Sequence, residues 1–180
     1  MTEPVQSFMT DVGRAADVNS YIAGQRLELT EFVLGSSARV IDGTEEIIAN
    51  EVWRGPINRI APTELLGQFV VEVVVPSEAG PFEVREGGAL DSAGRLIAIS
   101  KYAPFTKIVP EPGGINEAYL SMTVTLDHPE NLVLKIDPTV VTASRAHVED
   151  VVSVRDARLA TLAYISARNA LRAHPLFMET

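Results

Sequence analysis

The spacing of apolar residues changes along this chain, and each change marks a boundary between predicted elements. From residue 27 to residue 34 apolar and polar positions alternate, which predicts a strand that ends at residues 35–37. Residues 45–53 fit either a helical face or a strand, so their structure stays open. Before them, residues 7–23 predict an amphipathic helix ending at Gly24, with apolar residues at three- and four-residue spacings: Phe8, Val12, Ala15, Ala16 and Ile22.

Strands dominate the middle of the chain. Residues 68–75 are dense in valine, and residues 82–85 and 95–100 flank a turn at 91–94. Residues 118–126 and 132–136 alternate again on either side of a turn at 128–131. This last pair predicts an antiparallel hairpin.

Near the C-terminus the spacing of apolar residues becomes that of a helix. Residues 144–173 contain neither proline nor glycine, and their apolar side chains fall on one face about 120° wide. A helix of that length is about 45 Å long. The predicted fold class is therefore α+β, with an N-terminal helix packed on a mainly antiparallel sheet and a long C-terminal helix. The predicted domain division is 1–140 and 141–180.

Composition narrows the choice of partners. The 180 residues hold 15 Lys plus Arg against 24 Asp plus Glu, a net charge of −9, and no cysteine. An acidic domain repels phosphate, which argues against nucleic acid or an anionic membrane as a partner. No segment has the apolar length of a membrane span or the pattern of a signal peptide, so we expect a product made and kept in the cytoplasm of the producing cell.

Candidate chemistry is sparse. His128, His147 and His174 lack the spacing of metal ligands. Glu83 and Glu86 resemble a hydrolase carboxylate pair only superficially, because a strand puts Glu83 beside Arg85 and turns Glu86 to the other face. We expect no catalytic residue, no metal and no cofactor. Three glycine-containing stretches lack the phosphate-loop pattern and are interpreted as turns: Gly35-Ser36-Ser37, Gly87-Gly88 and Gly113-Gly114.

Two longer segments carry a more specific pattern, NEVWRGPIN at 50–58 and PFEVREGGALDSAGRLIAIS at 81–100. In order and spacing they resemble the N-terminal attachment domain of bacteriophage tail fibres, the tail-collar fibre family. The resemblance continues through residues 132–138 and covers roughly residues 9–150. The chain departs from the family pattern at residues 34–37, where many members read GDG.

This resemblance implies a non-enzymatic, homotrimeric structural protein that fastens a fibre to the baseplate. The expected location is the virion tail, after assembly in the host cytoplasm. Because the chain ends at Thr180 without a long shaft, we expect an adaptor that holds a second fibre protein, or a short baseplate component. A phage, a tailocin or an injection device would use the same architecture. Two alternatives are a carbohydrate- or receptor-binding module and a hydrolase using Glu72, Glu83 or Glu86.

The residues expected at the baseplate interface are Trp53, Arg54, Arg85, Glu86 and Gly88. Trp and Arg are enriched among side chains that dominate protein interfaces. The alternative is that Trp53 packs in the core and Arg54 pairs with a carboxylate such as Glu86.

The residues expected to drive self-association are Val148, Val152, Leu159 and Leu162. A strict heptad fails because polar residues such as Arg155 and Ser166 fall on the seam. The same apolar face could instead dock on the chain's own sheet.

Overall fold

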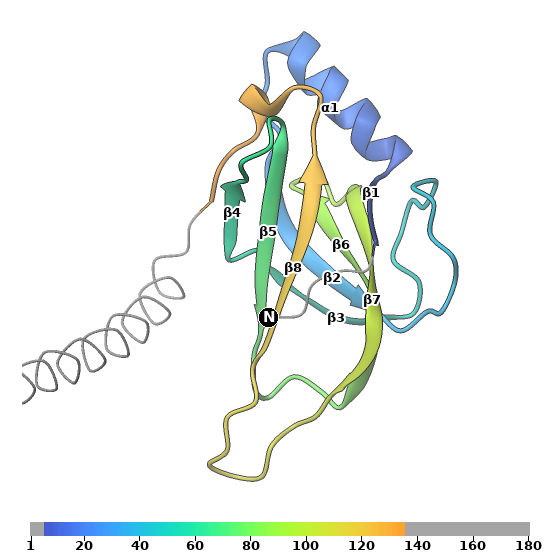
Figure 1. Ribbon diagram of the computed structural model, residues 1–180, viewed down its shortest axis with the longest axis vertical. Coiled ribbons are helices and arrows are strands. Elements are labelled where there is room, and N and C mark those ends of the chain that lie inside the picture. The colour runs from blue at the N-terminus through green and yellow to red at the C-terminus, as the bar shows by residue number, and fades with distance from the viewer. Residues whose placement is uncertain (1–5, 136–180) are drawn as a thin grey trace, which may run out of the picture. The chain divides into compact units, whose positions relative to one another are not determined.

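The computed structural model describes residues 6–135 as a mostly-β unit of two antiparallel sheets (Figure 1). The larger sheet has five strands in the order β1-β7-β6-β2-β3, and the smaller has three in the order β4-β5-β8. The elements are β1 (Gln6–Met9), α1 (Asp11–Ala23), β2 (Leu29–Gly35), β3 (Glu51–Pro56), β4 (Arg59–Pro62), β5 (Gln68–Val75), β6 (Phe82–Asp91), β7 (Leu96–Lys107), β8 (Ala118–Thr125) and the 3-10 turn η1 (Pro129–Asn131).

The predicted α+β fold class is wrong. Strands form most of the regular structure of the described residues, in two sheets rather than one, and α1 is the single α-helix among them. Local alternation predicts that a segment is a strand, but the number of sheets depends on pairings between distant segments. The long helix predicted over residues 144–173 lies outside the described residues.

The main core lies between the two sheets. The strand predicted at residues 68–75 is β5, and its buried and half-buried residues alternate along its whole length. Burying a valine or phenylalanine side chain completely contributes about 1.5–3 kcal/mol. The core joins Phe32, Leu34 and Val84 of the larger sheet to Val71, Val73, Leu120 and Met122 of the smaller.

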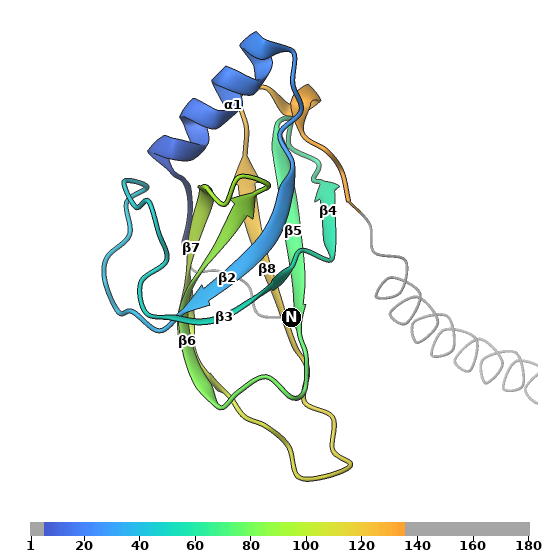
Figure 2. The same ribbon diagram turned by 180° about the vertical axis from the view of Figure 1, so that it is seen from behind.

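A second, smaller core lies on the other face of the larger sheet, under the loop 36–50 that joins β2 to β3 (Figure 2). Ile41 and Ile48 of this loop are buried there against Val33, Leu90, Leu96 and Ile99. The sheet is therefore covered on both faces near its centre. This explains why the last four residues of β2 are all buried, although strict alternation predicts one buried face.

Helix α1 begins later than the sequence predicts, because Gln6–Met9 form β1 and pair with β7. Thr10 caps the helix by accepting the Gly13 N–H at 2.9 Å. Gly24 ends it in the left-handed conformation, φ 63°, which confirms the predicted end. The helix lies so close to the Ile97 carbonyl of β7 that no Cβ fits at Gly13. Its buried face is accordingly small or polar, and Ile22, predicted on the apolar face, is exposed: Gly13, Ala16, Asp17 and Ser20 face inward.

The predicted hairpin of residues 118–126 and 132–136 is wrong in its second half. Strand β8 forms, but it pairs with β5. After η1, Leu132 makes a parallel bridge to Leu27, and the Val133 N–H donates to the Leu27 carbonyl at 3.0 Å. The backbone just after η1 is thus hydrogen-bonded to the segment that precedes β2. The local pattern of apolar residues does not reveal this pairing.

Candidate functional site

The two motif segments lie on either side of β2. The first forms β3, at the edge of the larger sheet, and the second forms β6. Leu34 of β2 is opposite both Trp53 and Gly87, and Val33 is opposite both Arg54 and Gly88. The five predicted interface residues therefore lie on β3 and β6, which are separated by β2. Of these two strands only β3 lies at the edge of the sheet.

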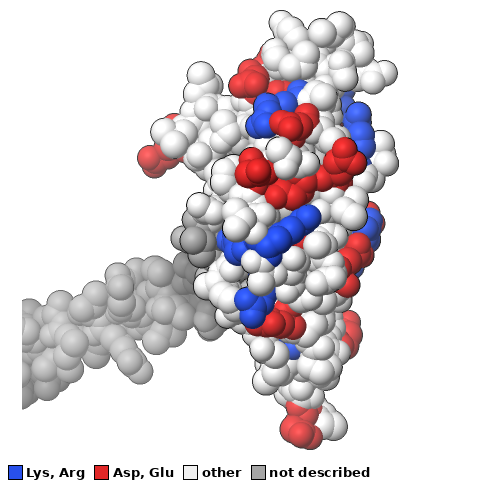
Figure 3. All heavy atoms as spheres, turned by 90° about the vertical axis from the view of Figure 1, so that its right-hand side faces the viewer, with Lys and Arg blue, Asp and Glu red and all other residues white. Residues whose placement is uncertain are grey.

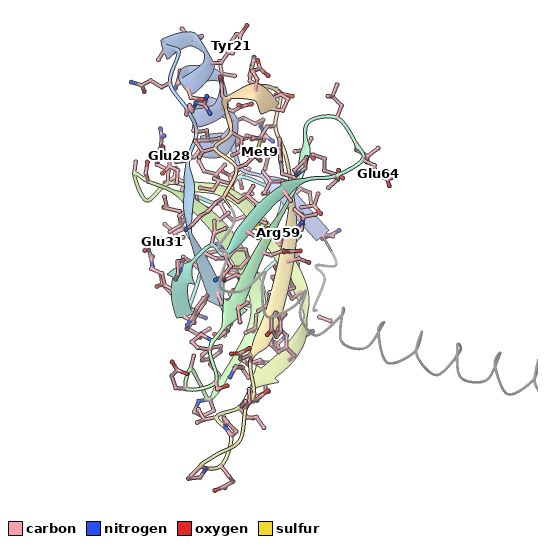
Figure 4. All side chains as sticks on the ribbon, turned by 90° about the vertical axis from the view of Figure 1, so that its left-hand side faces the viewer. Met9, Tyr21, Glu28, Glu31, Arg59 and Glu64 are labelled. Carbon is pink, nitrogen blue, oxygen red and sulfur yellow. The ribbon has the colours of Figure 1, made fainter. Side chains whose placement is uncertain are left out.

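Arg54 is exposed on β3 and is held by two carboxylates. Its Nε and Nη2 donate to Glu51 at 3.0 and 2.9 Å, and its Nη1 donates to Glu31 of β2 at 3.1 Å. Glu31 is labelled in Figure 4. The hydrogen bond to Glu51 is the main cause that raises the pKa of Arg54, and the same bond lowers the pKa of Glu51. The alternative that Arg54 pairs with a carboxylate is thus confirmed, but the partners are Glu31 and Glu51 and not Glu86, the example named from the sequence.

Trp53 is half-buried. It packs on the rim of the main core, and its indole lies over Gly55, where an added Cβ would stand 2.5 Å from the Trp53 Cη2. A side chain at position 55 would therefore displace the ring. The Trp-Arg-Gly order of the motif thus sets the indole position and leaves the guanidinium at the surface.

Glu86 is buried beneath the loop 36–50. Its carboxylate accepts from Arg39 Nε and Nη2 at 3.1 and 3.3 Å and from the Ala49 N–H at 2.6 Å. Arg39 also donates to the Ile47 carbonyl at 2.6 Å, and Lys101 Nζ donates to the Arg39 carbonyl. The carboxylate therefore fastens the loop to β6 and does not reach solvent. A hydrolytic role for Glu86 finds no support in this geometry.

Gly87 and Gly88 lie inside β6, so their interpretation as turn residues is wrong. A Cβ at Gly87 would stand 2.9 Å from both Phe32 Cε1 and Tyr102 Cε2. At Gly88 it would stand 2.9 Å from Ile48 Cδ1, and closer still to Leu96. The two glycines let the main core and the smaller core approach the sheet from opposite faces.

Arg85 is half-exposed and pairs with Glu83 at 2.9 Å, which confirms that these two side chains share a face. Acidic and basic side chains lie interspersed over the face of the molecule drawn in Figure 3. Exposed pairs of this kind each contribute about 0–1 kcal/mol.

Sequence reasoning missed three buried or half-buried charged residues. No sequence pattern around Arg39 indicates that this residue pairs with Glu86, although a buried carboxylate is expected to have a cationic partner. Lys107 is buried and donates to three backbone carbonyls. Asp17 is buried in α1 and accepts the N–H groups of Asp127 and His128 at 2.9 and 3.1 Å.

His128 is placed by packing. Its ring stacks on Tyr21 of α1 at a centroid distance of 4.2 Å, and its Nδ1 is 3.4 Å from Asp17 Oδ2. Among residues 6–135 no group of three or more His, Cys, Asp or Glu side chains is arranged to hold a metal. No helix in this part of the chain has the length and apolarity that crossing a membrane requires.

Comparison with known proteins identifies the family. Residues 1–146 match the family described as "Phage tail-collar fibre protein, N-terminal". The chain belongs to the tail-collar fibre protein family. Membership of the tail-collar fibre family gives it a structural role in a phage tail fibre and a place in the virion tail.

A curated relative supports the same family. The chain is 30% identical over 155 residues to the probable tail fiber protein of Escherichia phage P2, across 83% of the chain. The match spans 23% of that relative's length. No solved structure matches the chain. Trp53, Arg54, Arg85, Glu86 and Gly88 stay a prediction as interface residues, and Val148, Val152, Leu159 and Leu162 lie outside the described residues.

Proposed function

We propose that this chain attaches a tail fibre to the baseplate of a phage or phage-derived tail, as a homotrimer assembled in the host cytoplasm and without a catalytic step. Family membership supports a fibre role, and the finer attachment role is supported by β3. Its partners are then baseplate proteins and, where the chain acts as an adaptor, a second fibre protein.

The observation that carries this proposal is the presentation of Trp53 and Arg54 on an edge strand. Gly55 sets the indole, and Glu31 and Glu51 orient the guanidinium, so both side chains are ordered before any partner binds. Side chains ordered in advance lose less conformational entropy on binding. In this proposal Arg85 lies at the margin of the contact surface, while Glu86 and Gly88 support the surface from inside.

Self-association belongs to the same proposal. A fibre attachment domain needs a symmetric start for the fibre, and the apolar residues Val148, Val152, Leu159 and Leu162 within 141–180 are the candidates for it. Light scattering on a sizing column measures the molar mass of the purified chain directly. Three times the chain mass is the expected result, and a stable monomer or dimer contradicts an autonomous trimer.

The attachment role is tested by particle incorporation. Particles are produced with the Trp53→Ala, Arg54→Ala double variant, and the amount of this chain per particle is measured against a major tail protein. We expect a loss of at least about tenfold, the effect of removing one interface side chain that contributes about 1.4 kcal/mol.

Arg59→Ala is the matched control. The Arg59 side chain is as exposed as that of Arg54, 42% against 43%, and is paired with the carboxylate of Glu72 at 3.0 Å. Arg59 belongs to β4 of the smaller sheet (Figure 4). It should incorporate normally. Normal incorporation of a folded double variant would refute attachment through β3, and a glycan-array signal lost in that variant would favour receptor binding instead.

A further inference from the structure

The loop between β7 and β8 carries an exposed apolar surface at the end of the described unit opposite α1 (Figures 1 and 2). We define the tip surface as Ile108, Val109 and Ile115 of this loop with Tyr119 of β8. All four side chains are exposed, and Ile115 is 85% exposed. The arms that carry Ile108 and Ile115 are joined by the hydrogen bond from Asn116 to the Ile108 carbonyl, so this loop presents several exposed apolar side chains at one end of the unit. An exposed apolar surface is a candidate site of contact with another molecule.

The backbone under the tip surface is fixed by a buried lysine. Lys107 Nζ donates to the carbonyls of Ser77, Ala79 and Ile108 at 3.3, 3.1 and 3.2 Å. It thereby joins the base of the tip loop to the neighbouring loop 76–81. A buried ammonium bound by three carbonyls leaves little freedom to either loop.

Asn116 closes the other arm of the tip loop. Its N–H donates to Ser77 Oγ at 3.0 Å, and its Nδ2 donates to the Ile108 carbonyl at 2.8 Å. The arms that carry Ile108 and Ile115 are therefore held together. A surface held in one conformation loses little conformational entropy when it binds a partner.

The exposed charges around the tip surface have one sign, because the ammonium of Lys107 is buried. Residues 76–81 and 108–119 contain Glu78, Glu111 and Glu117 and no lysine or arginine. Tyr119 donates its hydroxyl to Glu117 at 2.7 Å, so one carboxylate borders the apolar surface directly. Charge complementarity requires a partner whose edge is basic.

We propose that the tip surface docks into an apolar pocket of another tail protein, edged by lysine or arginine side chains. This inference rests on the proposed attachment function, because it names the chemistry of a partner within the same tail. A second copy of this chain is a poor occupant in a two-fold contact, since such a contact would oppose the same three carboxylates.

The test uses the purified full chain and tail particles from a mutant that lacks this chain. Binding is measured for the wild type, Ile115→Asp and the control Leu66→Asp. Leu66 is 97% exposed and lies in the β4–β5 turn, two residues after Glu64. Figure 4 shows Glu64 on the side of the unit toward α1. We expect Ile115→Asp to weaken binding by at least about tenfold and Leu66→Asp to leave it unchanged.

The charge of the partner is tested separately. Binding of the wild type should weaken as NaCl rises from about 0.05 M to about 0.5 M, because salt screens exposed charges. The Glu111→Lys, Glu117→Lys double variant should bind more weakly and lose most of this salt dependence. Wild-type binding that is independent of salt would overturn the basic-edged pocket.

The outcomes separate the inference from the function on which it rests. Equal binding of the wild type and Ile115→Asp overturns docking through the tip surface and leaves fibre attachment standing. Failure of the wild type to bind these tails overturns both. A change in the molar mass of free Ile115→Asp assigns the surface to contacts between copies and also overturns the inference.

Discussion

The guanidinium of Arg39 donates to both carboxylate oxygens of Glu86, 47 residues away, beneath the loop that joins β2 to β3. A third hydrogen bond, from the Ala49 N–H, comes from the far end of the same loop. The pair thus links β6 to a loop that covers the smaller core. The glutamate in the Arg-Glu-Gly-Gly run of the second motif, Glu86, therefore has a structural role, which is to hold this loop on β6.

Removing Arg39 should destabilise the fold strongly. Arg39→Ala leaves the Glu86 carboxylate, whose side chain is 1% exposed, without its cation, and we expect a loss of about 3 kcal/mol in the free energy of unfolding. Arg54→Ala removes an exposed arginine that binds two carboxylates, those of Glu31 and Glu51, and should cost less than about 1 kcal/mol. Urea unfolding of both variants at neutral pH makes the comparison, and equal losses would contradict the role assigned to burial.

Gly88→Ala should overpack the smaller core. The new methyl group meets Ile48 and Leu96, and forcing one extra carbon into a packed site costs about 1–3 kcal/mol. Shortening the neighbour should relieve the clash, so Gly88→Ala combined with Ile48→Ala should be more stable than the sum of the two single changes implies. Thermal unfolding of the three variants completes the cycle, and strict additivity would show that Ile48 does not oppose the new methyl.

Tyr102→Phe should change the alkaline stability of the protein. Tyr102 is buried and donates its hydroxyl to the Ser121 carbonyl at 2.8 Å, joining β7 to β8 of the other sheet. Burial raises the pKa of Tyr102 above its ordinary value of 10.0, because the phenolate would lose its hydration. Above pH of about 10 the folded state then binds more protons than the unfolded state, so wild-type stability falls by up to about 1.4 kcal/mol per pH unit.

The Tyr102→Phe variant has no phenol at this position, so its stability lacks this dependence on pH. At neutral pH it should be about 1–2 kcal/mol less stable than the wild type, because the Ser121 carbonyl loses its donor. This difference should shrink as the pH rises above about 10. Denaturant unfolding between neutral pH and pH of about 11 measures both, and a constant difference across that range would contradict a buried, neutral Tyr102.

Asp17→Ala should release the segment that follows β8 from α1. The two backbone N–H groups of Asp127 and His128 lose their charged acceptor, at an expected cost of about 2–4 kcal/mol. Asp17→Asn keeps one acceptor oxygen and should cost less. Hydrogen exchange at these two amides is the local readout, and it should accelerate more in the alanine variant than elsewhere in the protein.

Elements defined by local pattern could be predicted from the sequence. The strand at residues 68–75 has a period of two over its whole length, and Gly24 ends α1 through its own conformational freedom. Gly94, with φ 77°, forms the turn between β6 and β7 in the same way. In these places neighbouring residues determine the structure.

Features that depend on distant contacts could not be predicted. The partner of Leu132 is Leu27, and the partner of Glu86 is Arg39, so no window of sequence contains both residues. Gly87 and Gly88 have the composition of a turn, yet they lie in β6, paired with β2 and β7. They are glycines because Phe32, Tyr102 and Ile48 leave no space for a Cβ. Residue type singles out Trp53 and Arg54 as a predicted contact pair, but it does not reveal that Glu31 of the neighbouring strand β2 binds Arg54.

The position of β2 between the two motif segments places them under different physical constraints. A change at Glu51 or Arg54 alters the outermost strand and leaves the Glu86–Arg39 pair and the packing at Gly88 untouched. Substitutions at the exposed positions of β3 are therefore expected to change what the sheet edge can bind while the sheet stays folded. Substitutions at Glu86 or Gly88 are expected to act through the stability of the whole unit.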